Sequence, residues 1–175
     1  LLTSALTMVE SQAAAMGVTV EVEPPRGEHL HLIGSPLNVQ QIVQNIMANA
    51  AKYNRPGGSV HVKCEEKSSD GEKAVFVFTC ADTGVGMSEE FQKHAFEPFV
   101  QENAQARTNY PGSGLGLAIA KKTVDYLGGE ISFVSEQGKG TTFTVTLPLR
   151  IDRDYKAEEP KKQETDDSIE GVSIL

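Results

Sequence analysis

The sequence has few cysteines, a deficit of positive charge and no long apolar run, and each shortage argues against a class of protein. Cys64 and Cys80 are too few for a disulfide framework, and the sequence has neither a CxxC motif nor a nearby His pair that would suggest zinc. Sixteen Lys and Arg stand against 24 Asp and Glu, which disfavours a broad cationic surface for nucleic acid or anionic lipid. No run approaches the roughly 20 apolar residues of a membrane-spanning helix. We therefore expect a soluble chain with no nucleic acid partner and no membrane contact.

The chain does have the length and apolar content of one ordinary domain. It has 175 residues, of which 39% are hydrophobic and 23% are charged, close to globular usage. Residues 151–168 are polar and lack apolar periodicity, which is typical of a solvated linker. Residues 169–175, IEGVSIL, are aliphatic again. We interpret residues 1–150 as one domain, 151–168 as a linker and 169–175 as the beginning of another domain.

Apolar periodicity within residues 1–150 predicts interleaved helices and strands without an internal repeat. Helices are predicted at 2–16, 36–53 and 114–127, and strands at 18–22, 29–33, 58–65, 74–81, 130–136 and 141–149. The loop of about 30 residues between Asp82 and Gly112 is long for a compact domain, and such loops are usually functional lids or unstructured segments. Because two glycine clusters flank it, we interpret it as a lid.

Three polar residues share one stripe of the predicted helix 36–53. At about 3.6 residues per turn, Asn45, Asn49 and Lys52 fall within about 60° of one another, beside an apolar stripe. Carboxamides offer neutral oxygens to a hard cation and lysine offers positive charge to phosphate, without a carboxylate that would repel a nucleotide. A solvated helix face would explain the same residues.

Two glycine-rich segments add to this pattern. The strand AVFVFTC leads to Asp82, followed by Gly84 and Gly86, so a carboxylate that can accept from a base amine is followed by glycines that admit a ligand. An ordinary turn explains that segment equally well. Residues 112–117, GSGLGL, open the last helix, where free backbone N–H groups favour phosphate. This segment is neither a Walker loop nor a Rossmann fingerprint.

Four segments, in order, resemble the N, first glycine, F and second glycine boxes of sensor histidine kinases. They are Asn45 to Tyr53, Asp82 to Gly86, Phe96 to Phe99 and Gly112 to Leu117. The resemblance covers about residues 1–150. It implies the α/β (α+β) Bergerat fold of the GHKL ATPases, a two-layer sandwich. In that fold a mixed, mainly antiparallel sheet of about five strands is covered on one face by about three helices, with a long ATP lid.

The resemblance also implies ATP and Mg²⁺ as cofactors, with Asn45, Asn49 and Lys52 as catalytic residues. Asn49 is the expected Mg²⁺ ligand, Asn45 a helper near metal or phosphates, and Lys52 a phosphate contact. Asp82 is expected to read the adenine amino group. The other expected nucleotide contacts are Tyr53, Gly84, Gly86, Phe96, Phe99, Arg107, Gly112, Gly114, Leu115, Gly116 and Leu117.

Within this set, the expected roles differ. Tyr53 is expected to form a wall beside the adenine, and the glycines that follow Asp82 are expected to shape the adenine pocket. The glycines of residues 112–117 are expected to admit the phosphates and to act as a hinge of the lid. Phe96 and Phe99 either anchor the base of the lid or are plain core residues, since their i, i+3 spacing suits both. Arg107 is a looser candidate for a phosphate contact, because an arginine in a loop is more often simply exposed.

One departure from related ATPases bears on mechanism. Members of the gyrase, chaperone and mismatch-repair type carry a water-activating Glu four residues before the metal-binding Asn, where this chain has Asn45. A carboxamide has no useful proton affinity near neutral pH, so it cannot act as a general base. Transfer of the γ-phosphoryl group to a separate nucleophile is therefore favoured over hydrolysis, which stays open as an alternative, as does a nucleotide-binding regulatory module without transfer activity.

The nucleophile of this family is a histidine on a two-helix dimerisation element. None of His29, His31, His61 and His94 has such surroundings. The resemblance therefore implies a histidine protein kinase whose acceptor lies on a separate dimerisation domain of a homodimeric parent. The terminal GVSIL resembles the opening strand of a receiver domain, which implies a hybrid kinase that works with a receiver domain or response regulator. We expect this domain to be cytoplasmic, whether or not its parent is anchored in a membrane.

Overall fold

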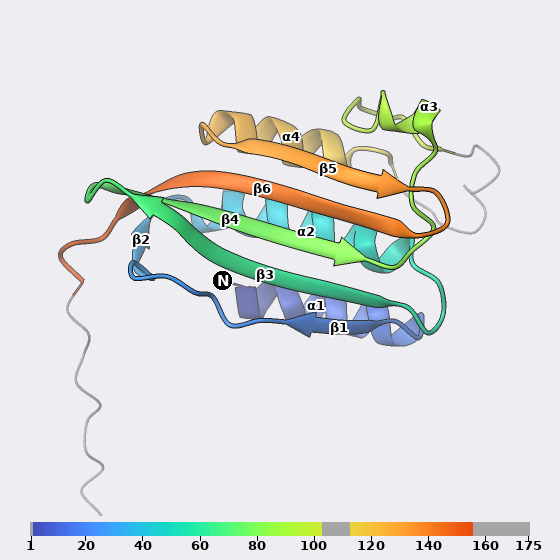
Figure 1. Ribbon diagram of the computed structural model, residues 1–175, viewed down its shortest axis with the longest axis horizontal. Helices are drawn as coiled ribbons and strands as arrows, with labels where there is room; N and C mark the ends of the chain where they lie inside the picture. The colour runs from blue at the N-terminus through green and yellow to red at the C-terminus, as the bar shows by residue number, and fades with distance from the viewer. Residues whose placement is uncertain (1, 103–112, 156–175) are drawn as a thin grey trace, which may run out of the picture.

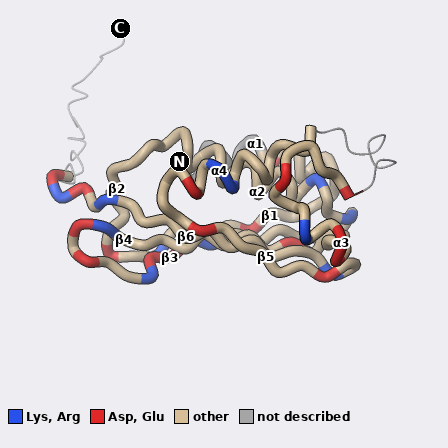
Figure 2. The backbone as a smooth tube through the Cα atoms, turned by 90° about the horizontal axis from the view of Figure 1, so that it is seen from above, with Lys and Arg blue, Asp and Glu red and all other residues tan. Residues whose placement is uncertain are grey.

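The computed structural model describes residues 2–102 and 113–155, which form a two-layer sandwich (Figure 1). The helices are α1 (Leu2–Ala15), α2 (Pro36–Lys52), α3 (Glu89–Gln92) and α4 (Gly116–Tyr126). The strands are β1 (Thr19–Val22), β2 (Leu32–Ile33), β3 (Ser59–Ser69), β4 (Lys73–Asp82), β5 (Glu130–Glu136) and β6 (Gly140–Ile151). Figure 2 shows the sheet edge-on, with α1, α2 and α4 together on one side of it. The expected two-layer α/β fold is confirmed.

The sheet contains six described strands rather than about five. Its order is β1-β3-β4-β6, and β6 is long enough to pair with β5 over its first half and with β2 at its far end. β1 runs parallel to β3, and all the other pairs are antiparallel. None of the helices in the described ranges is long and apolar enough to cross a membrane.

The hydrophobic core lies between α2 and the centre of the sheet. Alternation along β3 buries Val60 and Val62 and turns His61 to the open face, as the sequence predicts. On α2 the predicted apolar stripe is buried, including Ile42 and Ile46. Burying one such side chain contributes about 1.5–3 kcal/mol. This packing sets the rotation of α2 about its axis and therefore the direction of its polar stripe.

The ends of α2 follow from local chemistry. The Ser35 hydroxyl accepts the backbone N–H of Asn38, and Pro36 occupies the first turn, where a missing N–H costs nothing. After Lys52 the helix stops, and the buried Asn54 side chain donates to the carbonyl oxygens of Ala50 and Ser59 at 3.2 and 3.0 Å. Asn54 therefore fixes the turn that leads from α2 into β3.

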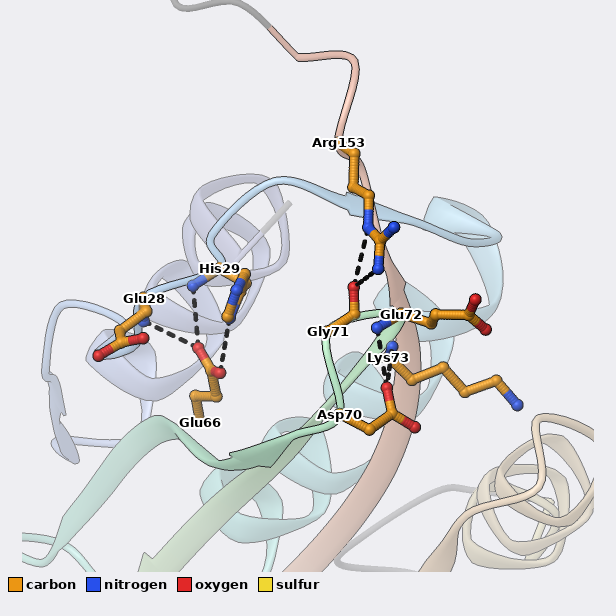
Figure 3. Close-up of polar contacts among 8 residues, drawn as sticks. All are labelled: Glu28, His29, Glu66, Asp70, Gly71, Glu72, Lys73 and Arg153. Carbon is orange, nitrogen blue, oxygen red and sulfur yellow. Dashed lines mark hydrogen bonds and ion pairs between the residues drawn. The ribbon is translucent and has the colours of Figure 1, made fainter.

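A carboxylate, that of Glu66, holds the loop that precedes β2 (Figure 3). It lies toward the end of β3 that is remote from Asp82, since Asp82 pairs with Val60 and Glu66 with Phe76. One oxygen of Glu66 accepts the backbone N–H groups of Glu28 and His29 at 2.8 and 2.9 Å, and the other lies 2.8 Å from Nδ1 of His29. These contacts, the backbone N–H of His29 first, lower the pKa of Glu66 below its usual value. Because the loop is held in this way, the predicted strand 29–33 shrinks to β2.

The turn between β3 and β4 is closed by a second carboxylate at the same end (Figure 3). Asp70 accepts the backbone N–H groups of Glu72 and Lys73, and the N–H of Lys73 is the main cause of the lowered pKa of Asp70. Arg153, which follows β6, donates to the carbonyl oxygen of Gly71. The chain after β6 is therefore tied back to this turn. β6 itself ends at Ile151, one residue beyond the predicted end of the domain.

Candidate functional site

A cavity of about 450 Å³ opens at the end of the sheet where β4 finishes, between α2 and the start of α4. Residues from three of the four sequence motifs line it, although these motifs are far apart in the chain. The predicted site residues among its lining are Asn49, Lys52, Tyr53, Asp82, Gly86, Gly114, Gly116 and Leu117. The tertiary structure therefore brings the N motif and both glycine motifs to one place.

The paired asparagines of α2 lie beside the first residue of α4. A side-chain carbon built on Gly116 would be 3.6 Å from Oδ1 of Asn45 and 3.7 Å from Nδ2 of Asn49. Within the described residues, Nδ2 of Asn45 is buried and has no hydrogen-bond partner. An unsatisfied buried donor costs about 1–3 kcal/mol, so this position favours a polar ligand group close to the start of α4.

Lys52 and Tyr53 end α2 at the wall of the cavity. The ammonium group of Lys52 lies 4.9 Å from the centre of the Tyr53 ring, a cation–π distance. Both side chains also line the cavity. In this arrangement a positive charge stands next to an aromatic face, which suits a ligand that combines a flat base with phosphates.

Asp82 ends β4 with a half-buried carboxylate that is already oriented by the backbone. Its Oδ1 accepts the N–H of Gly84 at 2.8 Å and the N–H of Thr141 at 3.2 Å. Burial raises the pKa of Asp82, and these two hydrogen bonds oppose that rise. Thr141 escaped the sequence reasoning, although its inward position in β6, in alternation with Phe143, is a signal that could have found it.

The glycines after Asp82 are required by the protein's own backbone. A side-chain carbon on Gly84 would collide with the carbonyl oxygen of Tyr53, and one on Gly86 would collide with that of Glu136. Gly86 also has a φ of 65°, which L-residues with a side chain rarely adopt. Close packing against α2 and the β5–β6 turn therefore explains these glycines without any need for ligand approach. Gly86 lines the cavity, whereas Gly84 is buried and does not line it.

The two phenylalanines of the F motif lie in different environments. Phe96 packs against the core, with its ring 5.5 Å from that of Phe133. Phe99 is 71% exposed and has a φ of 65°, so the alternative that it is a core residue is wrong. Neither belongs to the cavity lining. The backbone N–H of Phe99 donates to the carbonyl oxygen of Gly114 at 3.0 Å, which joins the F motif to the second glycine motif.

Three predicted residues remain, of which the structure describes only Leu115. Leu115 immediately precedes α4 and is half-buried, but it does not line the cavity. Arg107 and Gly112 lie outside the described residues. Apolar side chains that the sequence reasoning did not single out complete the wall, namely Val85, Met87, Phe91, Val100 and Phe143. Their residue types are common in any core, so only their placement identifies them.

The site suits a metal ion that is bound mainly by the phosphates of a substrate and by few protein side chains. In the described part of the chain, no group of three or more His, Cys, Asp or Glu side chains could hold a metal ion. Mg²⁺ commonly keeps several waters and binds through substrate phosphates with few protein ligands. The side-chain amides of Asn45 and Asn49 lie beside the start of α4, and their oxygens are of a type that fits such a shared ion.

Comparison with known proteins decides the family. Residues 34–151 match the model of the histidine kinase-, DNA gyrase B-, and HSP90-like ATPases. The chain belongs to this family. It is 38% identical over 135 residues to the autoinducer 2 sensor kinase/phosphatase LuxQ of Vibrio parahaemolyticus. The aligned segment covers 77% of this chain but 16% of that protein. The expected resemblance to sensor histidine kinases is thus confirmed, and the chain spans less than a fifth of the length of such curated relatives.

Solved structures agree with this assignment. The mycobacterial sensor histidine kinase MprB superposes with a TM-score of 0.62 at 30% identity, covering 86% of this chain and 97% of that one. Full-length ShkA in complex with AMPPNP superposes with a TM-score of 0.69 at 26% identity, covering 86% of this chain and 30% of that one. This chain of the ATPase family therefore has the fold of the ATP-binding catalytic domain of histidine kinases.

Proposed function

We propose that this domain binds Mg-ATP and supplies its γ-phosphoryl group to a histidine on a separate dimerisation domain. The observation that carries the proposal is the convergence of Asp82, the polar stripe of α2 and the glycine-rich start of α4 on one cavity. Separated motifs that meet in this way offer a carboxylate for a base, cationic and N–H groups for phosphates, and amide oxygens for a cation.

The residues that line the cavity suit both the base and the phosphates of ATP. Asp82 presents a carboxylate to the amino group of adenine, beside the wall formed by Tyr53. Lys52 and the backbone N–H groups near Gly116 favour the phosphates, since α4 directs the positive end of its dipole toward them. Asn49 is the proposed Mg²⁺ ligand. Bound Mg²⁺ would neutralise charge on the phosphates and orient them.

Transfer, rather than hydrolysis, follows from the side chain at position 45. Asn45 is a carboxamide and cannot take a proton from water near neutral pH. The bond between the γ-phosphorus and its bridging oxygen would break as a nitrogen of the acceptor histidine bonds to that phosphorus, with ADP as the leaving group. The residues of this chain would contribute chiefly positioning and charge stabilisation.

The parent of this domain is proposed to be a homodimeric hybrid sensor kinase with its ATP-binding domain in the cytoplasm. The relatives that support this proposal are sensor kinases several times longer than this chain. In the parent, residues 151–168 would act as a linker and residues 169–175 would begin a receiver domain, although most of this segment lies outside the described residues. A receiver domain or response regulator would then take the phosphoryl group.

Calorimetry and a transfer assay test the proposal together. The domain should bind ATP more tightly with Mg²⁺ than without it, and Asn49→Asp should reduce the Mg²⁺-dependent affinity about tenfold or more, because it adds negative charge beside the phosphates. A histidine-bearing dimerisation domain added in trans should become labelled from γ-labelled ATP. Binding without labelling would instead support a regulatory module, and release of free phosphate without labelling would support a hydrolase.

A further inference from the structure

We propose that Arg55 is a positioning residue that sets the preference of this site for adenine. It would do so by holding residues 83–86, termed here the base loop, through hydrogen bonds to their backbone. This inference rests on the proposed binding of ATP. Arg55 lies two residues beyond the N motif, belongs to none of the four motifs and does not line the cavity.

The guanidinium group of Arg55 joins three carbonyl oxygens from two distant segments. Its Nε donates to the carbonyl of Thr83 at 2.8 Å, and its Nη2 donates to that of Gly84 at 2.8 Å. The same Nη2 donates to the carbonyl of Gly138 in the β5–β6 turn at 2.5 Å. One side chain therefore connects the end of α2, the base loop and the β5–β6 turn.

Backbone hydrogen bonds between the same segments complete this arrangement. The N–H of Val85 donates to the carbonyl oxygen of Tyr53 at 3.0 Å, and the N–H of Gly138 donates to that of Val85 at 2.7 Å. The close approach of Gly86 to Glu136 adds a steric contact on the same side. The base loop is thus packed between two other segments, and Arg55 supplies the charged contacts among them.

The base loop supplies one of the two backbone hydrogen bonds that orient the Asp82 carboxylate. Oδ1 of Asp82 accepts the N–H of Gly84, the residue whose carbonyl oxygen Arg55 binds. A shift of Gly84 would therefore move a hydrogen-bond donor of the carboxylate that is proposed to read the adenine amino group. Small misplacements of such groups reduce discrimination, because a hydrogen bond weakens steeply as its angle departs from linear.

Arginine is suited to this role by its geometry. Its guanidinium is planar, permanently charged and presents five N–H donors in a fixed fork, so one group can bind several carbonyl oxygens that converge on it. Lysine has a single ammonium group on a flexible stem and cannot bridge the same oxygens in a fixed geometry. The conservative replacement Arg55→Lys should therefore retain charge but lose part of the positioning.

The test compares ATP with purine riboside triphosphate, which lacks only the 6-amino group. Titration calorimetry of the full chain would give the ratio of the two Kd values for the wild type, Arg55→Ala and Arg55→Lys. We expect the preference for ATP to fall about fivefold or more in Arg55→Ala, the scale of the net contribution of one ordinary hydrogen bond, and to an intermediate value in Arg55→Lys. The matched control is Arg26→Ala, which removes an exposed arginine paired with Glu23.

Amide hydrogen exchange gives a second readout, because a loss of overall stability would not confine faster exchange to the base loop. The N–H groups of Gly84 and Val85 should exchange faster in Arg55→Ala than in the control, whereas N–H groups at the centre of β4 should not. If Arg55→Ala fails to fold, the nucleotide preference and exchange of Arg55→Lys decide instead.

The outcomes separate this inference from the proposed function. A wild type that prefers ATP, together with a folded Arg55→Ala of unchanged preference, would overturn the role of Arg55 and leave ATP binding intact. A wild type with no preference between the two nucleotides would show that Asp82 does not read the amino group, and the role of Arg55 would fall with it. A lower melting temperature with an unchanged Kd ratio would mean that Arg55 is merely structural.

Discussion

The backbone N–H of Phe99 lies 3.0 Å from the carbonyl oxygen of Gly114, and this hydrogen bond joins the two ends of the segment between them. Both residues have positive φ angles, 65° and 69°. The contact is close, because a side-chain carbon on Gly114 would lie 3.0 Å from the carbonyl carbon of Phe99. The base of the proposed lid is therefore formed by two backbone segments in direct contact, and the contacting residue of each has the positive φ that glycine adopts most easily.

Gly114→Ala should destabilise this base and weaken nucleotide binding. The new methyl group would meet backbone atoms of Phe99 and Val100 at 3.0 Å in addition to the cost of the positive φ, so we expect a loss of about 2–3 kcal/mol in the free energy of unfolding. Chemical denaturation measures it. In the control Gly128→Ala, φ is 73° but no atom lies within 4 Å, so the loss should be only about 1 kcal/mol. Equal losses would contradict the steric argument.

Phe99→Asn should leave the fold as stable as the wild type or more stable. The Phe99 side chain is largely exposed, and asparagine adopts positive φ angles more readily than phenylalanine. The expected change is between zero and a gain of about 1 kcal/mol by thermal denaturation. Phe96→Asn, three residues earlier, should instead lose about 3 kcal/mol or more because Phe96 packs against the core. A large loss in Phe99→Asn would show that its exposed ring supports the fold.

Asp82→Asn should weaken ATP binding without lowering the stability of the nucleotide-free domain. Burial holds the pKa of Asp82 in the folded state above the usual 3.8. Between these two pKa values the folded state binds more protons than the unfolded state, so the free energy of unfolding falls as pH rises through the folded pKa. Asparagine retains an acceptor for Gly84 and Thr141 but carries no buried charge. At neutral pH we expect a melting temperature equal to or above that of the wild type, with ATP affinity lower by about tenfold or more.

The control for this change is Asp125→Asn, which neutralises an exposed aspartate paired with Lys121 on α4. It should leave ATP affinity unchanged in calorimetry. A clear drop in the melting temperature of Asp82→Asn, or unchanged ATP affinity, would contradict the assigned role of the Asp82 carboxylate.

Glu66→Gln should make the stability of the protein less sensitive to acid. Hydrogen bonds from His29 and Glu28 hold the folded pKa of Glu66 below the usual 4.5, so its stabilising effect is present above that value and is lost as pH falls through the folded pKa. The variant should be less stable than the wild type near neutral pH, and the difference should shrink below pH 4.5. Urea denaturation across this range, with the exposed Glu130→Gln as control, would reveal it. A constant difference at every pH would contradict the linkage.

Elements with strong local signals agree closely between sequence and structure. α2 begins at Pro36, directly after the Ser35 cap, as a cap followed by a helix-initiating proline would predict, and it ends one residue earlier than expected. β5 has the predicted bounds of residues 130–136. β2 is shorter than expected because the Glu66 carboxylate, 37 residues away in sequence, holds the amide of His29 in a loop. Such a contact leaves no trace in local periodicity.

By itself the sequence determined the helices and strands with strong apolar periodicity and, through the resemblance of its four motifs to those of sensor histidine kinases, the fold class and the family. Both kinds of signal are read from residue types along the chain and need no knowledge of distant contacts. Only the tertiary structure decided that Phe99 is exposed while Phe96 is packed, that Thr141 orients Asp82 and that Arg55 binds the base loop. Each of these depends on which distant backbone atoms come within hydrogen-bond or van der Waals reach. That proximity arises when the sheet and α2 pack around a common core.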